Sequence, residues 1–147
     1  MTITDPYLKV TDALVTAIRG LTAYFPQAYQ VTFNRSDMSR GADYFFILTP
    51  GAFSDARLDN RDDVVTWVTQ CELAVRFAEY NTRTDKFLQA RGDIRALLKT
   101  PHALPNIKLR PPVIVTGGEL RQDVPGLNPN WIVQPITVTI NQIVANI

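Results

Sequence analysis

One long run of alternating residues, from Val64 to Glu79, constrains the fold more than any other feature of this chain. Its odd positions are mainly apolar, and polar residues stand at many of the even positions between them. A period of two is typical of a β-strand that buries one face and leaves the other partly wet. At ~3.3 Å per residue the run would reach roughly 50 Å, about three times the length of an ordinary strand. A chain of 147 residues cannot cover such a strand on both faces, so we expect part of it to bend, protrude or pair with another molecule.

The composition fits one globular domain. Of the 147 residues, 46% are hydrophobic and 20% are charged, and 15 basic against 14 acidic residues give a net charge of +1. This balance argues against a dedicated nucleic-acid binder, which usually carries a basic excess. The sequence shows neither a signal peptide nor a run near the ~20 apolar residues of a membrane span. We therefore expect a single domain over residues 1–147, made in the cytoplasm and without a membrane contact.

The only cysteine, Cys71, lies at one of the odd, mainly apolar positions of the long run, as does Trp67. A single cysteine excludes an intramolecular disulfide. No helix N-terminus or basic cluster is evident beside it that would lower the pKa of its thiol. We therefore interpret Cys71 as a small buried hydrophobe and Trp67 as a core residue.

Two segments have the spacing of amphipathic helices. The first starts near Pro6, with Thr4 or Asp5 as its cap, and ends at Pro26. We expect this helix to pack on a sheet.

The second helical segment follows the long strand, with Thr84 as its expected cap and Pro101 as its stop. Gly92 lies inside it and costs about 1 kcal/mol relative to alanine, which suggests a close contact there. The expected buried stripe comprises Phe87, Ala90, Ile94, Leu97 and Leu98.

Two strands are expected before the long run. Residues 29–33 form a short one, and Tyr44–Thr49 is apolar on both parities, as in a central strand buried on both faces. Pro50 and Gly51 are expected to end this second strand.

Two further strands are expected near the C-terminus. Val113–Thr116 is a short one, and Gly117-Gly118 is expected to turn the chain back as a hairpin. The last strand covers residues 131–147 and contains Pro135, which predicts an edge position or a bulge. The order is then α, β, β, β, α, β, β, which predicts an α+β domain: a mainly antiparallel twisted sheet with two helices packed on one side.

The segment 51–63 interrupts this pattern with four aspartates and two arginines, and it is interpreted as a long loop or an extended hairpin tip. Its carboxylates could offer oxygens to Mg²⁺ or Ca²⁺, but their spacing matches no EF-hand loop and arginines lie among them. The lone His102 has no nucleophile motif to accompany it. We therefore expect no catalytic residue, no metal site and no cofactor, and a charged segment that is solvated or paired with another molecule.

The layout as a whole resembles the tail-terminator or neck-terminator proteins of tailed bacteriophages. The resemblance rests on a helix that leads into two strands, a long strand that runs into a second helix, and a last strand after a variable region; these are DPYLKVTDALVTAIRGLTAYF, VVTWVTQCELAVRFAEYN, RTDKFLQARGDIRALLKT and WIVQPITVTINQIV. It covers nearly the full length, as a single tail-terminator-like domain over residues 1–147.

The resemblance implies a structural virion protein rather than an enzyme. Such proteins form rings, typically hexamers, that cap the tail tube, stop its polymerisation and present a docking surface to the head connector. The partners implied are further copies of the chain, the tail tube protein and a connector or head-closure protein, with DNA passing through the lumen without being read. Two alternatives stay open: another head–tail joining adaptor, such as a head-closure subunit, and a small metal-dependent hydrolase that uses the acidic segment.

For the interface between subunits the sequence suggests charged residues on a segment too long for a bare turn. Interspersed arginine and aspartate orient a contact without strong self-repulsion. Tryptophan is over-represented among strongly contributing interface residues. The candidates are Arg57, Asp59, Arg61, Asp62 and Asp63, followed by Arg83 at the strand–helix junction and Trp131.

Overall fold

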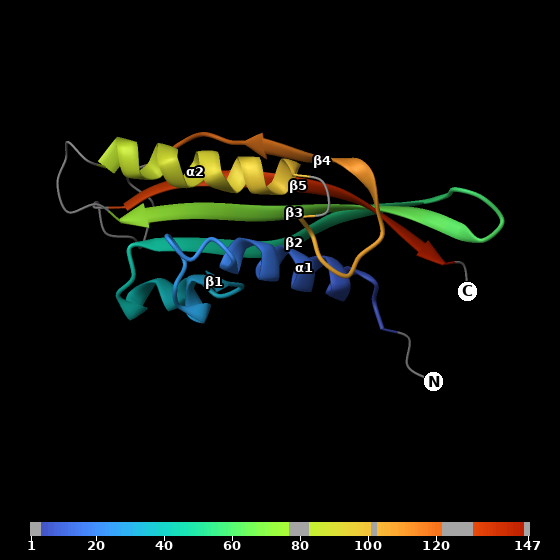
Figure 1. The fold of residues 1–147 in the computed structure, drawn as a ribbon, viewed down its shortest axis with the longest axis horizontal. Coiled ribbons are helices and arrows are strands. Elements are labelled where there is room, and N and C mark those ends of the chain that lie inside the picture. Colours follow the sequence, from blue (N-terminus) through green and yellow to red (C-terminus); the bar gives the residue numbers. More distant parts are fainter. Residues whose placement is uncertain (1–3, 77–82, 101–102, 122–130, 146–147) are drawn as a thin grey trace.

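The computed structural model of the protein describes residues 4–76, 83–100, 103–121 and 131–145 (Figure 1). Within these residues the predicted order of helices and strands is confirmed, and two short 3₁₀ helices are added. The elements are α1 (Tyr7–Arg19), η1 (Ala28–Gln30), β1 (Val31–Thr32), η2 (Arg35–Arg40), β2 (Tyr44–Arg57), β3 (Asp62–Arg76), α2 (Arg83–Lys99), β4 (Leu109–Gly117) and β5 (Trp131–Ala145).

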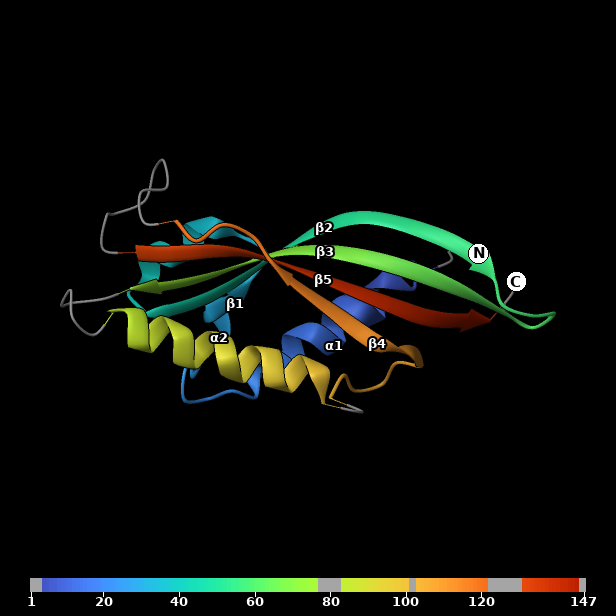
Figure 2. The ribbon, with the colours of Figure 1, turned by 90° about the horizontal axis from the view of Figure 1, so that it is seen from above.

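The strands form a five-stranded sheet in the order β1-β2-β3-β5-β4. Only the two-residue β1 runs parallel to its neighbour, and the pairs β2–β3, β3–β5 and β4–β5 are antiparallel. Figure 2 shows both α-helices on the same side of this twisted sheet. The predicted α+β fold, with two helices covering one side of a mainly antiparallel sheet, is confirmed.

The long alternating run is the strand β3, which pairs with β5 along its whole length. Its odd-numbered apolar residues face the helices, because a strand turns successive side chains to opposite faces. Cys71 and Trp67 are both buried there, as expected. Residues 77–79 of the run lie outside the described part of the chain. The buried residues that this face shares with the helices include Val10, Leu14, Ile18, Phe87, Ala90, Ile94, Leu98, Val65, Leu73, Val75, Ile136, Val138 and Ile140.

The opposite face of the sheet has a second buried cluster at one end, where the η2 segment covers it. Phe45, Ile47 and Ala74 form a second cluster there with Met38, Trp131 and Val133. Both faces of the Tyr44–Thr49 segment are therefore buried, as predicted from the apolar residues at its odd and even positions. Beyond this cluster the same face mixes apolar and polar residues, with hydrogen bonds between Thr66 and Asn141 and between Thr137 and Gln70.

β2 does not end at Pro50 and Gly51 but continues to Arg57, and the loop interpretation of residues 51–63 is wrong. The register with β3 shifts between Pro50 and Phe53. A Cβ placed on Gly51 would lie 2.2 Å from the carbonyl oxygen of Val68, so only glycine lets the two strands approach at this irregularity. The alternative interpretation, an extended hairpin, is confirmed, and only residues 58–61 form its turn.

The two predictions for the C-terminal strands need correction. Gly117 and Gly118 do not turn the chain back: Gly118 donates its N–H to the carbonyl of Pro135 at 2.7 Å, and Arg121 bridges to Val133, so the chain continues along β5. Pro135 lies in an interior strand and pairs with β3 without a register shift, so the predicted edge position is wrong. On the β4 side one extra residue separates the pairs Gly117↔Ile136 and Arg121↔Val133, so the predicted irregularity lies on that side. The carbonyl of Pro135 faces the β4 side, just past the end of β4. The N–H that a proline lacks would face the same side, so no hydrogen bond to β3 is lost.

The first helix begins as expected and ends early. The carboxylate of Asp5 accepts the N–H of Tyr7 at 2.9 Å, at the start of α1. The helix stops at Arg19, with Gly20 as its C-cap, rather than at Pro26. Glycine is a poor helix former, and the turn after Gly20 directs the next aromatic residues into the core.

In the second helix the predicted buried stripe is confirmed, with Leu97 only partly buried. The helix begins at Arg83, so Thr84 lies within it rather than capping it. A Cβ added to Gly92 would meet no atom within 4 Å, so the expected close contact at this glycine is wrong.

Candidate interaction surface

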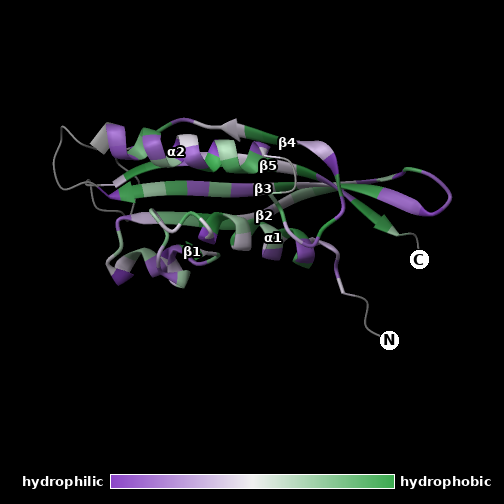
Figure 3. Ribbon diagram, viewed as in Figure 1, coloured by the Kyte–Doolittle hydropathy of each residue, from purple (hydrophilic) through white to green (hydrophobic). Residues whose placement is uncertain are grey.

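The charged segment of the sequence forms a projecting β-hairpin, which we call the arm and define as residues 53–66. Figures 1 and 2 show it extending beyond both helices at one end of the molecule, with the end of β5 alongside. Cross-strand pairs run from Phe53↔Trp67 to Arg57↔Asp63, and the last residues of β5 pair with the other side of β3. The turn of the arm is largely hydrophilic (Figure 3).

The turn at the tip of the arm is held by its own hydrogen bonds. The backbone N–H groups of Leu58 and Asp59 donate to the carbonyl of Asp62 at 3.0 and 3.2 Å. The Asp59 carboxylate in return accepts the N–H groups of Arg61 and Asp62 at 2.7 and 2.8 Å. These two bonds hold the pKa of the Asp59 carboxyl below its usual value, because they favour the charged form. The carboxylate of Asp59 therefore shapes the turn.

The remaining charged side chains of the arm are exposed or half-buried. Arg57 and Asp63 approach to 3.9 Å, and the arginine side chain is 68% exposed, so this pair contributes little to stability. Among the residues that the structure describes, Arg61 and Asp62 form no ion pair. Four aspartates and two arginines give the arm a net charge of −2. These side chains carry charges of both signs and contribute little to the stability of the subunit.

An aromatic group joins the arm to the body. The ring of Trp67 lies 4.7 Å from that of Tyr7 and 5.4 Å from that of Phe53. Trp67 donates its indole N–H to Gln142 at 2.9 Å and is buried, which confirms it as a core residue. Phe53 completes this group but is 65% exposed. The sequence interpretation missed Phe53 because it placed this residue in a loop, where strand parity does not apply.

The structure brings together five of the seven predicted interface residues and separates the other two. Arg57, Asp59, Arg61, Asp62 and Asp63 all lie on the arm. Arg83 starts α2 at the opposite end of the molecule (Figure 2). Trp131 is 6% exposed, with its ring 5.8 Å from that of Phe45, so most of its surface already packs within the subunit.

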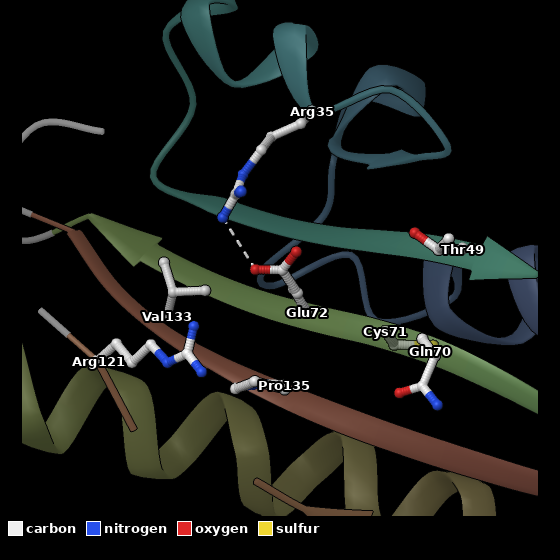
Figure 4. Close-up of a pocket in the computed structure, with 8 residues that line it drawn as sticks. All are labelled: Arg35, Thr49, Gln70, Cys71, Glu72, Arg121, Val133 and Pro135. Carbon is white, nitrogen blue, oxygen red and sulfur yellow. Dashed lines mark hydrogen bonds and ion pairs between the residues drawn. The ribbon is translucent and has the colours of Figure 1, made fainter. Parts of the chain in front are cut away.

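A depression of about 240 Å³ lies on the face of the sheet away from the helices (Figure 4). The ion pair between Arg35 and Glu72, at 2.9 Å, crosses it. Cys71 is a lining residue, but its side chain lies on the helix-covered face of β3, where it is 1% exposed and burial raises the pKa of its thiol to about 12. The lining therefore offers no activated nucleophile. The residues around the depression are Arg35, Thr49, Gln70, Cys71, Glu72, Arg121, Val133 and Pro135.

Metal binding and membrane spanning find no support in the described residues. They contain no group of three or more histidine, cysteine, aspartate or glutamate side chains placed to hold a metal ion. None of their helices is long and apolar enough to cross a membrane. His102 lies outside the part of the chain that the structure describes.

The fold and the arm define a class of protein: a two-layer α+β domain whose sheet extends past its helices as a charged hairpin. Among solved structures this chain is similar to a chain in the virion of a native gene transfer agent particle, with a TM-score of 0.58 and 14% sequence identity over 93% of this chain and 95% of that one. At this level of sequence identity, the structural match shows a shared fold alone. No protein-family model matches the sequence, and no curated protein matches it.

Proposed function

We propose that this protein is a structural component of a phage-like virion that forms a ring at the end of the tail tube. In this role it ends tube polymerisation and provides the surface that joins the tail to the head connector. The fold that it shares with a gene transfer agent virion chain over nearly the whole of both chains supports a virion protein. The observation that carries the proposal is the arm, which extends the sheet beyond both helices and contributes Val65, near its base, to the core.

A ring of identical subunits needs heterologous contacts, in which one patch meets a different patch on the next copy. The arm meets this need because it extends beyond both helices at one end of the molecule and carries charged side chains of both signs. The charged residues proposed for the contact are Arg57, Asp59, Arg61, Asp62 and Asp63. The further partners are the tail tube protein on one ring face and a connector or head-closure protein on the other. DNA passes through the lumen, and the protein resides in the virion.

The test of termination is the shape of particles assembled without the protein. We expect overlong tails, or tails that fail to join heads, when the gene is deleted, and restoration when the protein is supplied. For a head-closure subunit we would expect tails of normal length, so overlong tails are the outcome that separates the two roles. Tails of normal length that join heads would contradict the proposal.

The test of the arm is the double charge reversal Arg57→Glu and Arg61→Glu. Because both side chains are exposed, we expect the fold to survive and ring formation, measured by light scattering and negative-stain imaging, to weaken by about tenfold or more. The matched control is Lys9→Glu with Arg95→Glu, which changes the net charge equally on the exposed sides of α1 and α2. Unchanged assembly and tail joining in the arm variant would show that these charges are not the interface.

A further inference from the structure

A second cavity, of about 340 Å³, lies between α2 and the end of β4, and we call it the α2–β4 groove. Figures 1 and 2 show α2 beside this edge of the sheet. Ile94 on α2, Val115 on β4 and Ile136 on β5 form the apolar part of its lining. Gly117 also lines it and has no side chain to fill the space. The groove therefore adjoins the edge strand of the sheet.

Two arginines of α2 complete the lining of the groove. Arg91 and Arg95 are one turn apart, so they lie on the same face of the helix. Arg91 donates to the side-chain oxygen of Gln134 at 2.9 Å, and the Gln134 amide in turn donates to the carbonyl of Gly118 at 2.8 Å. Neither arginine forms an ion pair with any residue that the structure describes. The groove therefore holds two guanidinium groups without a carboxylate partner in the described part of the chain.

The charges of the chain are distributed unevenly around this groove. Residues 83–121, which contain α2 and β4, include eight basic and three acidic residues, whereas the rest of the chain has seven basic and eleven acidic ones. Asp93, the acidic residue between the two arginines, accepts the hydroxyl of Tyr24 in the turn after α1. A basic surface of this kind is complementary to an acidic partner.

The strand beside the groove is an open edge. β4 pairs with β5 on one side, and no described strand pairs with its other side. Gly118 donates its N–H to the carbonyl of Pro135, which makes these two residues a hydrogen-bonded pair. Such pairs alternate along an antiparallel ladder, so the N–H and C=O groups of Val115 and Gly117 point away from β5. An exposed edge offers these groups to another strand.

We propose that the α2–β4 groove binds an extended acidic segment of another protein, which adds to the sheet as an antiparallel strand beside β4. Its acidic side chains face α2 and meet Arg91 and Arg95, while its backbone pairs with Val115 and Gly117. On the opposite face the added strand covers part of Ile114, which is 49% exposed. In strand addition the backbone hydrogen bonds supply affinity and the pockets for alternate side chains supply specificity. The unpaired backbone groups beside the arginines favour a polypeptide over a nucleic acid, which has no strand backbone to pair with them.

The first test uses a fluorescent peptide of alternating threonine and glutamate, about nine residues long and blocked at both ends. As an extended strand it turns all its glutamates to one face. We expect it to bind the full chain, measured by fluorescence polarisation, and to bind the variant Arg95→Glu about fivefold or more weakly. The matched control Lys9→Glu makes the same change of net charge at an exposed position of α1 and should bind like the unmodified protein. Equal binding by the two variants, or no binding at about 1 mM peptide, would overturn the proposal.

The second test separates backbone pairing from charge and needs no variant of the protein. Residues directly opposite each other in an antiparallel pair share a face of the sheet, so the glutamates opposite Val115 and Gly117 are the residues whose N–H groups point to β4. N-methylation of the glutamates removes these donors, and we expect binding to fall by about tenfold or more. N-methylation of the threonines blocks only N–H groups that point away from β4, so it should leave binding unchanged. Equal binding of the two methylated peptides would overturn strand addition.

These outcomes do not depend on the proposed ring, because the isolated chain suffices for each measurement. Peptide binding by a protein that forms no rings would support the groove and contradict only the ring. Self-association that Arg95→Glu abolishes would assign the groove to a second copy of this chain and overturn the choice of another protein. A short DNA duplex that displaces the peptide, and that does not bind Arg95→Glu, would assign the arginines to nucleic acid and overturn the proposal as well.

Discussion

At the scale of the residue, Cys71 illustrates how position decides chemistry. Its parity in β3 places it on the helix-covered face, where it is 1% exposed. Burial disfavours the thiolate and raises the pKa of the thiol to about 12. Since the thiolate is the reactive form, a buried cysteine in this position acts as a packing residue.

The first prediction concerns the reactivity of Cys71. A maleimide reagent at pH 8 should not modify the folded protein over hours and should modify it within minutes in urea. Mass spectrometry of the intact protein provides the measurement. Fast modification without denaturant would show that β3 opens readily in the native state, contrary to its central place in the sheet.

At the scale of the element, the hairpin β2–β3 depends on one glycine. Pro50 and Gly51 are residues that usually end a strand, yet the chain keeps pairing past them through a shifted register. The shift requires the backbone of Gly51 to lie against the carbonyl of Val68, which leaves no room for a side chain. The arm therefore continues the sheet through a position that looks like its end.

The second prediction is a pair of glycine substitutions. Gly51→Ala should lower the free energy of unfolding by about 1–3 kcal/mol, because the new methyl group meets the backbone. Gly92 lies in the middle of α2, and a Cβ added there would meet no atom within 4 Å. Gly92→Ala should therefore raise the free energy of unfolding by about 0.5–1 kcal/mol, because alanine has the higher helix propensity. Urea unfolding measures both. A neutral Gly51→Ala would mean that the two strands separate at the shift at little cost.

At the scale of the whole molecule, the two helices and the sheet are joined by side-chain hydrogen bonds, buried or partly buried, as well as by apolar packing. Tyr24, in the turn after α1, donates its hydroxyl to the carboxylate of Asp93 on α2. Gln30 donates to the carbonyls of both Tyr24 and Tyr44, each at 2.9 Å. These contacts connect the segment between α1 and β1 to the rest of the domain.

The third prediction follows from the pKa of Tyr24. Burial, together with the hydrogen bond to Asp93, raises the pKa of Tyr24 to about 12 from its ordinary value of 10. The folded state therefore holds this proton when the unfolded state has released it, and stability falls as the pH rises from 10 to 12. Tyr24→Phe should reduce this alkaline loss, measured as urea midpoints across that range.

Asp93→Asn serves as the control for the same prediction. It removes the negative charge beside Tyr24 and leaves the burial, which is the larger cause of the raised pKa. The alkaline loss of stability should therefore shrink only in part. An alkaline loss unchanged in Tyr24→Phe would show that other groups govern it, such as Cys71, whose raised pKa acts in the same direction.

The sequence by itself determined the type of most elements and the faces that they bury. Hydrophobic residues that recur every two or about every 3.6 positions are a local signal, because they mark the side of a strand or helix that is turned away from water. They sufficed for the order of elements, for the buried face of β3 with Cys71 and Trp67, and for the stripe of α2. The sequence also identified the charged residues of the arm, but it did not predict that they form a β-hairpin rather than a loop.

Only the tertiary structure decided which strands are neighbours and where each one ends. Pairing depends on contacts between residues far apart in the chain, and these override local signals such as Pro50-Gly51 and Pro135. The same contacts buried Trp131 against Phe45 of β2 and left Phe53 exposed at the base of the arm. Among the described strands, the open edges along β4 and along β2 beyond Ile47 became visible for the same reason, since an edge exists only once the strand order is known.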